Sequence, residues 1–258
     1  MKVVLFCGGL GTRLREHSDT IPKPLVNIGY RPILWHLMRY YAHFGHNEFI
    51  LCLGHRGDLI REYFLNYNEC MSNDFVLSAG GKKIELLSRD LDDWRITFVD
   101  TGLHSNIGQR LLRVRDFVKD EEMFLANYAD ALTDLPLDQH LAEFQRKGTI
   151  ASLLAVPTAS SFHGVHAAAD GLVTAFGQMK DADFWVNAGF FCFRQEIFEH
   201  IREGEELVEE PFQRLIEAGQ LGVFRYSGFW RQMDTFKDKI TFDRMEGRGD
   251  CPWMLWKD

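Results

Sequence analysis

Residues 1–14 read MKVVLFCGGLGTRL, and this stretch predicts both the type of fold and the place of its ligand. The apolar run at residues 3–6 has the length and composition of a buried β-strand. Glycines at positions 8, 9 and 11 follow at once, and glycine allows bare backbone amides to approach a ligand that a Cβ would hold away. A glycine-rich turn behind a first strand typically binds phosphate through these amides.

Three polar side chains beyond this turn strengthen the prediction of a phosphate site. Thr12 supplies a hydroxyl, and Arg13 and Lys23 supply two cations that pair with phosphate oxygens. The glycine spacing matches neither the dinucleotide fingerprint Gly-x-Gly-x-x-Gly nor the P-loop, which ends in Gly-Lys-Ser/Thr. A tight turn without a ligand is the alternative for the glycines alone, but the Thr-Arg pair and the lysine before Pro24 favour phosphate.

The composition is that of an ordinary globular protein without a basic surface. The 258 residues carry a net charge of −8 and no run of Lys or Arg, so we expect no nucleic-acid partner. No apolar run approaches the ~18 residues of a membrane span, and no signal-peptide pattern precedes the first strand. We therefore expect no membrane partner and a cytoplasmic location. The five cysteines contain no C-x-x-C pair, which disfavours a disulfide framework and a zinc site.

Apolar residues at helical spacing alternate with short apolar runs along the first part of the chain. Helices are predicted at residues 32–44 and 58–67, and buried strands at 48–53 and 96–102. Residues 70–95 interrupt this alternation and have the pattern of an inserted β-hairpin. The alternation predicts an α/β fold with a parallel sheet, right-handed crossovers, and ligands at the carboxyl ends of the strands.

The second part of the chain continues with the same two patterns. The predicted helices are at residues 108–118, 135–147, 195–203 and 210–218, and the predicted strands at 123–128, 150–156 and 223–226, with short strands over 162–193. Arg110 stands in the first turn of its helix, directly after a strand end. Its side chain either faces water or contacts the substrate.

Two aspartates follow apolar stretches at the ends of predicted strands. Asp130 comes after the strand at 123–128, where a carboxylate is poorly placed for stability and well placed to hold Mg²⁺ beside a triphosphate. Asp234 follows residues 228–233 and precedes a helix. The alternatives are a turn or helix cap for Asp130 and an N-cap for Asp234. Two carboxylates at strand ends can share one cation, which predicts a magnesium site.

Several segments along nearly the whole chain together resemble the sugar nucleotidyltransferase family, and in particular its cytidylyltransferase branch. The segments are GGLGTRL at 8–14, KPL at 23–25, PILWHLMRYY at 32–41, REYFLNY at 61–67, VDTG at 99–102, NAGFF at 187–191 and GFWRQMDT at 228–235. The resemblance implies one domain of residues 1–258, a Rossmann-like three-layer α/β sandwich with a mixed, mainly parallel central sheet and a small inserted β-hairpin. The nucleotide-binding half spans about residues 1–135 and the acceptor-binding half about 136–258.

The resemblance also implies an activity and roles for individual residues. The family transfers a nucleotidyl group from a nucleoside triphosphate to a sugar 1-phosphate, and the branch implies CTP with glucose 1-phosphate or a different phosphorylated acceptor. The implied triphosphate contacts are Gly8, Gly9, Leu10, Gly11, Thr12, Arg13 and Lys23. The implied catalytic residues are Arg13, Lys23 and Asp130, the implied Mg²⁺ ligands are Asp130 and Asp234, and the implied ribose or sugar contact is Asn187. Besides what the resemblance implies, we expect acceptor contacts from Arg110, Tyr128 and Lys180. A homo-oligomer is also implied.

The sequence departs from the family pattern on the acceptor side. The family's Gly-Asp-Gly is Ala-Asp-Ala at 129–131, and we expect its two methyl groups in space where a ligand meets bare backbone. The family's Glu-Lys-Pro is Gly-Gln-Met at 177–179, with Lys180 as the nearest replacement, and its Arg-Phe-Gly is Phe-His-Gly at 162–164. Two hypotheses stay open: an active enzyme with a different acceptor, or a non-catalytic relative with a regulatory or scaffold role.

Overall fold

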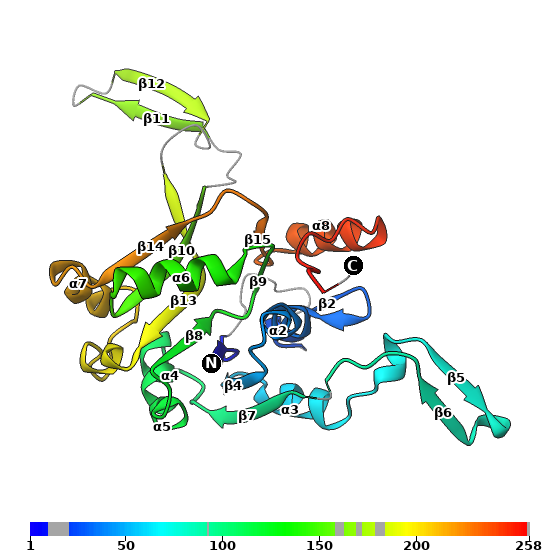
Figure 1. Cartoon of the computed structure of the whole chain (residues 1–258). Coiled ribbons are helices and arrows are strands. Elements are labelled where there is room, and N and C mark those ends of the chain that lie inside the picture. Colours follow the sequence, from blue (N-terminus) through cyan, green and yellow to red (C-terminus); the bar gives the residue numbers. More distant parts are fainter. Residues whose placement is uncertain (10–20, 92, 158–162, 169–171, 179–183, 257–258) are drawn as a thin grey trace.

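A computed structural model describes residues 1–9, 21–91, 93–157, 163–168, 172–178 and 184–256. Its centre is a seven-stranded sheet in the order β14-β10-β13-β8-β1-β4-β7 (Figure 1). The strands are β1 (Lys2–Phe6), β4 (Glu48–Leu53), β7 (Arg95–Asp100), β8 (Met123–Asn127), β10 (Ala151–Pro157), β13 (Trp185–Arg194) and β14 (Leu221–Arg225). Only β13 pairs antiparallel with its neighbours in this sheet, so the predicted mixed and mainly parallel sheet is confirmed.

Helices cover both faces of this sheet, which gives the predicted three layers. In β1, Val3 and Leu5 belong to one buried cluster and Val4 and Phe6 to another, because successive side chains of a strand point to opposite faces. The first cluster takes buried residues of α2 (Ile33–His43), α3 (Gly57–Leu65), α6 (Leu137–Lys147) and α8 (Phe236–Gly247). The second takes those of α4 (Ile107–Arg113), α5 (Arg115–Val118) and α7 (Glu210–Glu217). The α/β fold class is confirmed.

Two predicted helices differ from the structure. The helix expected at 108–118 is broken at Val114, whose φ of −103° and ψ of 6° leave the helical region while its side chain is buried in the second cluster. The helix expected at 195–203 is only a 3₁₀ turn, η6 (Gln195–Glu199). Among the described residues no helix is long and apolar enough to cross a membrane.

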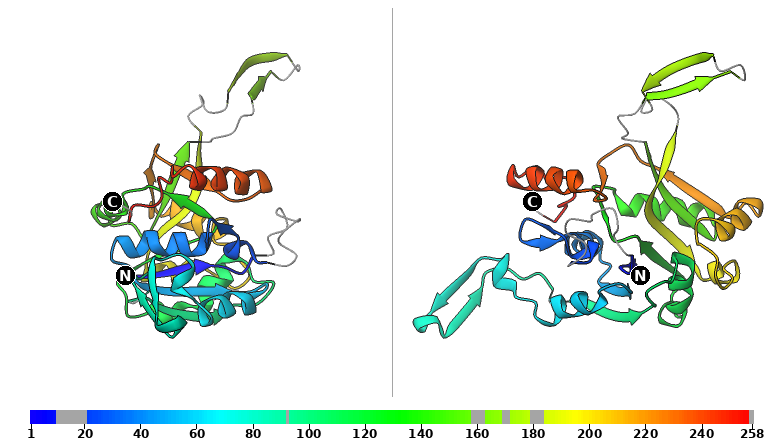
Figure 2. Two further views of the ribbon diagram at one scale, coloured as in Figure 1. Left: turned by 90° about the vertical axis from the view of Figure 1, so that its right-hand side faces the viewer. Right: turned by 180° about the vertical axis from the view of Figure 1, so that it is seen from behind.

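Two hairpins extend from the body of the molecule, as the right-hand view of Figure 2 shows. The predicted inserted hairpin is present as β5 (Phe75–Ser78) paired with β6 (Lys83–Leu86). The second hairpin pairs β11 (His163–Ala167) with β12 (Val173–Gln178). A further ribbon pairs β2 (Asn27–Ile28) with β3 (Arg31–Pro32). Within the described ranges the other 3₁₀ turns are η2 (Lys23–Leu25), η3 (Glu69–Met71) and η4 (Ala79–Gly81).

A short two-stranded ribbon decides where the functional residues meet. It pairs β9 (Ala131–Thr133) with β15 (Trp230–Gln232), antiparallel, with Gln232 opposite Ala131. The amide of Met233 also donates to the carbonyl of Asp130, with an N···O distance of 2.9 Å. This ribbon brings the chain after β15 beside the end of β8, so two segments about a hundred residues apart reach one edge of the sheet.

Candidate active site

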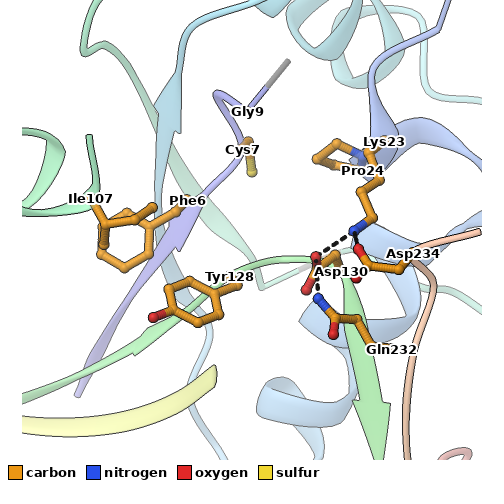
Figure 3. Close-up of a pocket in the computed structure, with 10 residues that line it drawn as sticks. All are labelled: Phe6, Cys7, Gly9, Lys23, Pro24, Ile107, Tyr128, Asp130, Gln232 and Asp234. Carbon is orange, nitrogen blue, oxygen red and sulfur yellow. Dashed lines mark hydrogen bonds and ion pairs between the residues drawn. The ribbon is translucent and has the colours of Figure 1, made fainter. Parts of the chain in front are cut away.

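A cavity of about 510 Å³ lies where β1 and β8 end side by side (Figure 3). Its lining residues come from the ends of these two strands, from η2, from the start of α4 and from the chain after β15. They are Phe6, Cys7, Gly9, Lys23, Pro24, Ile107, Tyr128, Asp130, Gln232 and Asp234. The carboxyl ends of parallel strands are the usual ligand edge of such a sheet, and the cavity lies at the edge that the sequence predicted.

Lys23 joins the two predicted metal ligands. Its Nζ lies 2.6 Å from Oδ2 of Asp130 and also forms an ion pair with Oδ1 of Asp234. The three side chains are 14%, 14% and 26% exposed, so this cluster is partly withdrawn from water and still reached from the cavity. The turn η2 presents Lys23 to the cluster, and the buried ring of Pro24 fixes the backbone behind it. The two aspartates therefore share a cation, which here is an ammonium group.

Gln232 is a site residue that the sequence analysis missed. Its Nε2 donates to Oδ2 of Asp130 at 3.0 Å, so this carboxylate oxygen accepts from both Gln232 and Lys23. A signal was present in the sequence, because residues 232 and 234 are two apart and side chains alternate along an extended strand. The amide fixes the orientation of the Asp130 carboxylate.

The N-cap alternative for Asp234 is wrong. Helix α8 is capped by Thr235, whose side chain accepts from the backbone amide of Asp238 while the Asp238 carboxylate accepts from the Thr235 amide. This is a complete capping box, so the helix start needs nothing from Asp234. The Asp234 carboxylate is thereby available for Lys23 in the cavity.

The two alanines beside Asp130 were expected to place their methyl groups in the space of the ligand, but neither alanine lines the cavity. Ala129 and Ala131 are buried, and both belong to the hydrophobic cluster behind the site rather than to its lining. The backbone conformation of Ala129 is instead unfavourable, because its φ of 62° lies in the left-handed region that favours glycine. Its amide donates to Oδ1 of Asn127 at 2.7 Å, which holds this turn in place. The methyl group of Ala129 therefore strains the turn rather than blocking the ligand.

Arg110 lies beneath the glycine turn, neither in water nor in the cavity. Its side chain is 3% exposed, and its donors reach Oγ1 of Thr101 at 2.7 Å and the carbonyls of Gly8 at 3.0 Å and Leu53 at 3.1 Å. Burial lowers the pKa of the Arg110 guanidinium from its usual value. These contacts occupy the donors that an acceptor phosphate would need, so the predicted acceptor contact is replaced by support of Gly8 from below.

Gly8 and Gly9, the two described members of the predicted triphosphate loop, have different surroundings. A Cβ on Gly8 would lie 2.1 Å from Nη1 of Arg110, so the tight approach of this guanidinium requires glycine. A Cβ on Gly9 would meet no described atom within 4 Å, and Gly9 lines the cavity. The other predicted loop residues, which are Leu10, Gly11, Thr12 and Arg13, lie outside the described part of the chain, as does Lys180.

Tyr128 and Asn187 meet on the other side of the cavity. Nδ2 of Asn187 lies 3.4 Å from the hydroxyl of Tyr128, and Oδ1 of Asn187 accepts from the amide of Gly189 at 2.9 Å. Burial raises the pKa of Tyr128 to about 12, so its hydroxyl remains a proton-bearing donor at neutral pH. The ring of Tyr128 lines the cavity together with Phe6 and Ile107. This wall offers an apolar surface with hydrogen-bonding groups at its rim.

The two carboxylates of the cluster suit a hard divalent cation that takes its other ligands from the substrate and from water. Within the described ranges no group of three or more His, Cys, Asp or Glu side chains is placed to hold a metal. Asp130 and Asp234 alone supply two carboxylates. Mg²⁺ is typically bound through one or two carboxylates, with phosphate oxygens and water as the other ligands. The donor set therefore suits a metal that arrives with a triphosphate.

Comparisons with known proteins place these residues in a family. The nucleotidyl transferase family model matches residues 2–244. A Bacillus subtilis protein named "probable glucose-1-phosphate cytidylyltransferase" is 37% identical over 258 residues, covering 99% of this chain and 100% of the relative. A Salmonella typhimurium protein named "glucose-1-phosphate cytidylyltransferase" is also 37% identical, and all of both chains is covered.

The fold is also found among solved structures. A UDP-glucose pyrophosphorylase in complex with UDP-glucose superposes with a TM-score of 0.70 and 14% sequence identity. The match covers 96% of this chain and 98% of that one. At this identity the likeness concerns the fold alone, and it agrees with the mixed, mainly parallel sheet.

Proposed function

The chain belongs to the nucleotidyl transferase family, and we propose that it transfers CMP from CTP to a sugar 1-phosphate, giving a CDP-linked sugar and pyrophosphate. The observation that carries this proposal is the Lys23, Asp130 and Asp234 cluster at the end of the glycine turn. Glycine amides, an ammonium group and two carboxylates suit a site that receives a triphosphate with its cation. The names of the two relatives supply the base and the acceptor class.

In the proposed reaction a phosphate oxygen of the acceptor attacks the α-phosphorus of CTP. The new bond joins this oxygen to the α-phosphorus, and the bond to the bridging oxygen of pyrophosphate breaks. Both reactants are anions, so the protein acts by positioning them and neutralising charge, without a protein nucleophile. Lys23 neutralises charge on the α-phosphate, and the predicted role of Arg13 is to do the same for the leaving pyrophosphate.

Asp130 and Asp234 are the proposed ligands of Mg²⁺. When bound, this cation draws the phosphate groups together and neutralises their charge. Gln232 keeps one oxygen of Asp130 oriented toward the cavity. Lys23 occupies the space between the two carboxylates in the structure, so binding of the metal requires its ammonium group to move toward the phosphates.

For the acceptor we propose glucose 1-phosphate or a related sugar 1-phosphate, held by the Tyr128 and Asn187 side of the cavity. The paired hydroxyl and amide suit sugar hydroxyls, and the apolar wall beside them suits a sugar ring. Lys180 is the proposed replacement for the family lysine that is missing from 177–179. A non-catalytic relative is the second hypothesis, but a scaffold has no need of a carboxylate pair with a cation between them.

One assay decides between the active enzyme and the scaffold. Purified protein is incubated with Mg²⁺, each nucleoside triphosphate in turn and a panel of sugar phosphates, and pyrophosphate release is followed. We expect release with CTP and a sugar 1-phosphate. Tight CTP binding without release for any pair would support the scaffold, and release with another triphosphate would reject the proposed base.

We also propose a homo-oligomer, as the family resemblance implied, and a cytoplasmic location, as expected from the cysteines and from the sequence patterns that are missing. The described cysteines are all free, and Cys7, Cys52 and Cys192 are buried, which suits a reducing compartment. Light scattering coupled to size-exclusion chromatography measures the assembly state directly. A mass equal to one chain of 29.9 kDa at micromolar concentration would contradict the oligomer.

A further inference from the structure

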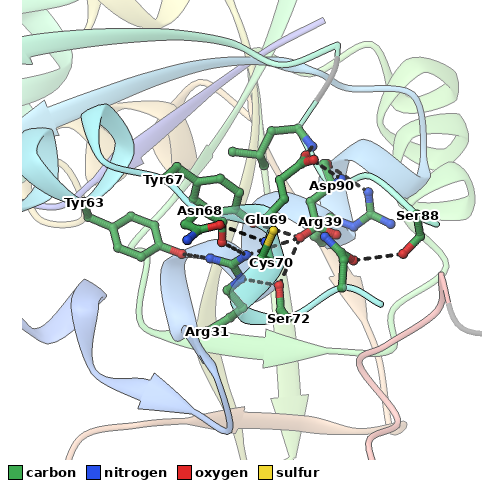
Figure 4. Close-up of polar contacts among 12 residues, drawn as sticks. Arg31, Arg39, Tyr63, Tyr67, Asn68, Glu69, Cys70, Ser72, Ser88 and Asp90 are labelled. Carbon is green, nitrogen blue, oxygen red and sulfur yellow. Dashed lines mark hydrogen bonds and ion pairs between the residues drawn. The ribbon is translucent and has the colours of Figure 1, made fainter. Parts of the chain in front are cut away.

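A second cavity, of about 370 Å³, lies away from the active site and shares no lining residue with it. Its walls come from the start of α2, the root of the hairpin β5–β6 and the C-terminal segment (Figures 1 and 4). This C-terminal segment is fixed in place, because Trp253 is buried and its indole N–H donates to Nδ1 of His36 at 3.4 Å. The cavity has the size of a small-molecule site.

The hairpin root is held by a closed polar network, shown in Figure 4. Arg31 donates to Oγ of Ser72 at 2.6 Å and to the carbonyl of Asn68 at 3.0 Å, and its Nη2 lies 3.6 Å from the carboxylate of Asp90. Asp90 also accepts from the hydroxyl of Tyr67 at 2.9 Å. Arg31 and Asp90 thus have structural roles here, and the network forms a rigid floor for the cavity.

Three N–H groups from other lining residues have no hydrogen-bond partner in the described part of the chain. They are Nε1 of Trp35, Nε of Arg39 and Nδ2 of Asn73. The Trp35 side chain is only 6% exposed, and a buried donor without an acceptor costs free energy. Three such donors belong to residues that line one cavity, two on α2 and one at the hairpin root. They indicate a ligand whose oxygen atoms accept hydrogen bonds from them.

The charged and aromatic side chains of the lining indicate the chemical class of this ligand. Three arginines, Arg31, Arg39 and Arg89, line the cavity against two carboxylates, Asp90 and Glu246, so its lining favours an anion. The guanidinium of Arg39 lies 5.9 Å from the ring centre of Trp35 and 5.7 Å from that of Trp256. Trp35 is buried and packs against Trp256 with 5.9 Å between the ring centres, while the half-buried Trp256 offers an indole on which a flat ring can stack.

We propose that this second cavity binds a small organic phosphate that carries a flat ring. The several oxygens of a phosphate suit three separate N–H donors better than the two of a carboxylate, and its charge pairs with Arg39. The ring stacks on the indole of Trp256, because Trp35 is buried. This site is additional to the proposed nucleotidyl transfer and would bind its ligand whether or not that reaction is correct.

Calorimetric titration of the whole protein tests the site with adenosine 5′-monophosphate, adenosine and inorganic phosphate as probes. We expect the monophosphate to bind. The other two probes should bind at least about tenfold more weakly, because adenosine lacks the phosphate and inorganic phosphate lacks the ring. The variant Arg39→Gln should weaken the monophosphate about tenfold or more, while Arg202→Gln, at an exposed arginine outside the cavity, should leave it unchanged.

A second variant and an active-site variant make the result decisive. Trp256→Leu should weaken the monophosphate at least about fivefold and change inorganic phosphate little, because only the ring is affected. Circular dichroism confirms that each variant is folded. Weakening by Lys23→Gln but not by Arg39→Gln would show that the probe occupies the active site and would overturn the proposal. No binding of the monophosphate at millimolar concentration would overturn it as well.

Discussion

Lys23 Nζ lies 2.6 Å from Oδ2 of Asp130 and also pairs with Asp234, so it stands between the two carboxylates that are proposed to hold Mg²⁺. One ammonium group against two carboxylates compensates half of the negative charge of the ligand-free cluster. Partly buried carboxylates that face each other without a cation are unfavourable, because their repulsion is poorly screened. Lys23 is therefore expected to have two effects that can be measured separately. It stabilises the ligand-free protein, and it contributes to phosphate binding.

Lys23→Met should destabilise the ligand-free protein by about 1–3 kcal/mol, because it leaves Asp130 and Asp234 without their cation. Mg²⁺ should then raise the melting temperature of the variant more than that of the wild type, since no ammonium group has to be displaced. Differential scanning fluorimetry with and without Mg²⁺ measures both effects. Lys239→Met, which removes an exposed pair with Asp243, is the control and should show neither. Equal Mg²⁺ responses in wild type and Lys23→Met would refute a shared site.

Substitution by alanine should have different effects at Gly8 and Gly9: the first should lower stability, and the second should weaken CTP binding. A methyl group at Gly8 would meet the Arg110 guanidinium, which its own hydrogen bonds hold in place, so Gly8→Ala should cost about 1–3 kcal/mol of unfolding free energy. Gly9→Ala has room within the described structure and should unfold like the wild type, but its methyl group enters the cavity and should weaken CTP binding. Urea unfolding and CTP titration test the pair, and the reverse pattern would contradict the placement of Arg110.

Ala129→Gly should change the free energy of unfolding by less than about 0.5 kcal/mol, although it removes a buried methyl group. The left-handed φ of 62° is costly for alanine and free for glycine, and this gain is offset by the greater freedom of glycine in the unfolded chain and by the lost packing of the buried methyl group. Ala131→Gly is the matched control, because Ala131 lies in β9 and its buried methyl group packs in the core. We expect this control to lose about 1 kcal/mol in chemical unfolding. A loss of similar size at both positions would mean that the turn is not strained.

His140 should make stability depend on pH. It is 1% exposed, its Nε2 lies 3.0 Å from Oγ of Ser152, and burial lowers its pKa from 6.5 to about 4. Between these values the unfolded chain binds a proton that the folded chain does not. Stability is therefore full above about pH 6.5 and falls as the pH drops through 4, by roughly 3–3.5 kcal/mol in total.

Unfolding free energies in urea at about pH 7.5 and about pH 5 measure this loss. His140→Gln should reduce the difference between the two pH values, and the exposed His104→Gln should not. An unchanged pH dependence in His140→Gln would assign the effect to other groups.

The sheet and most helices were predictable because each depends on a local pattern. Apolar runs and helical periodicity placed the core strands and α2, α3 and α6 within a few residues. The role of Arg110 was not predictable, because it depends on oxygens of Gly8, Leu53 and Thr101 that only the folded sheet brings together. A polar residue after a strand end has the same sequence pattern whether it meets a ligand or the protein's own backbone.

The candidate site was predictable in part for a related reason. Asp130 and Asp234 each follow a strand, but they meet at one edge because the antiparallel ribbon β9–β15 brings the chain after β15 beside the end of β8, and this pairing has no local sequence signal. Lys23 was predicted beside phosphate, but its pairing with both aspartates depends on the turn η2 and could not be derived from spacing. The strained turn at Ala129 was hidden, because alanine gives no sign of a left-handed backbone.

Asp130 is proposed to hold the cation required for CMP transfer. The most direct test is the initial rate of pyrophosphate release from CTP and glucose 1-phosphate in Mg²⁺, compared among wild type, Asp130→Asn and Asp58→Asn. Asp58 is 69% exposed and lies outside the cavity, so its variant should match the wild type. We predict that Asp130→Asn lowers kcat/KM by a factor on the order of 100–1000 while the protein stays folded. A wild-type rate in folded Asp130→Asn would contradict the account.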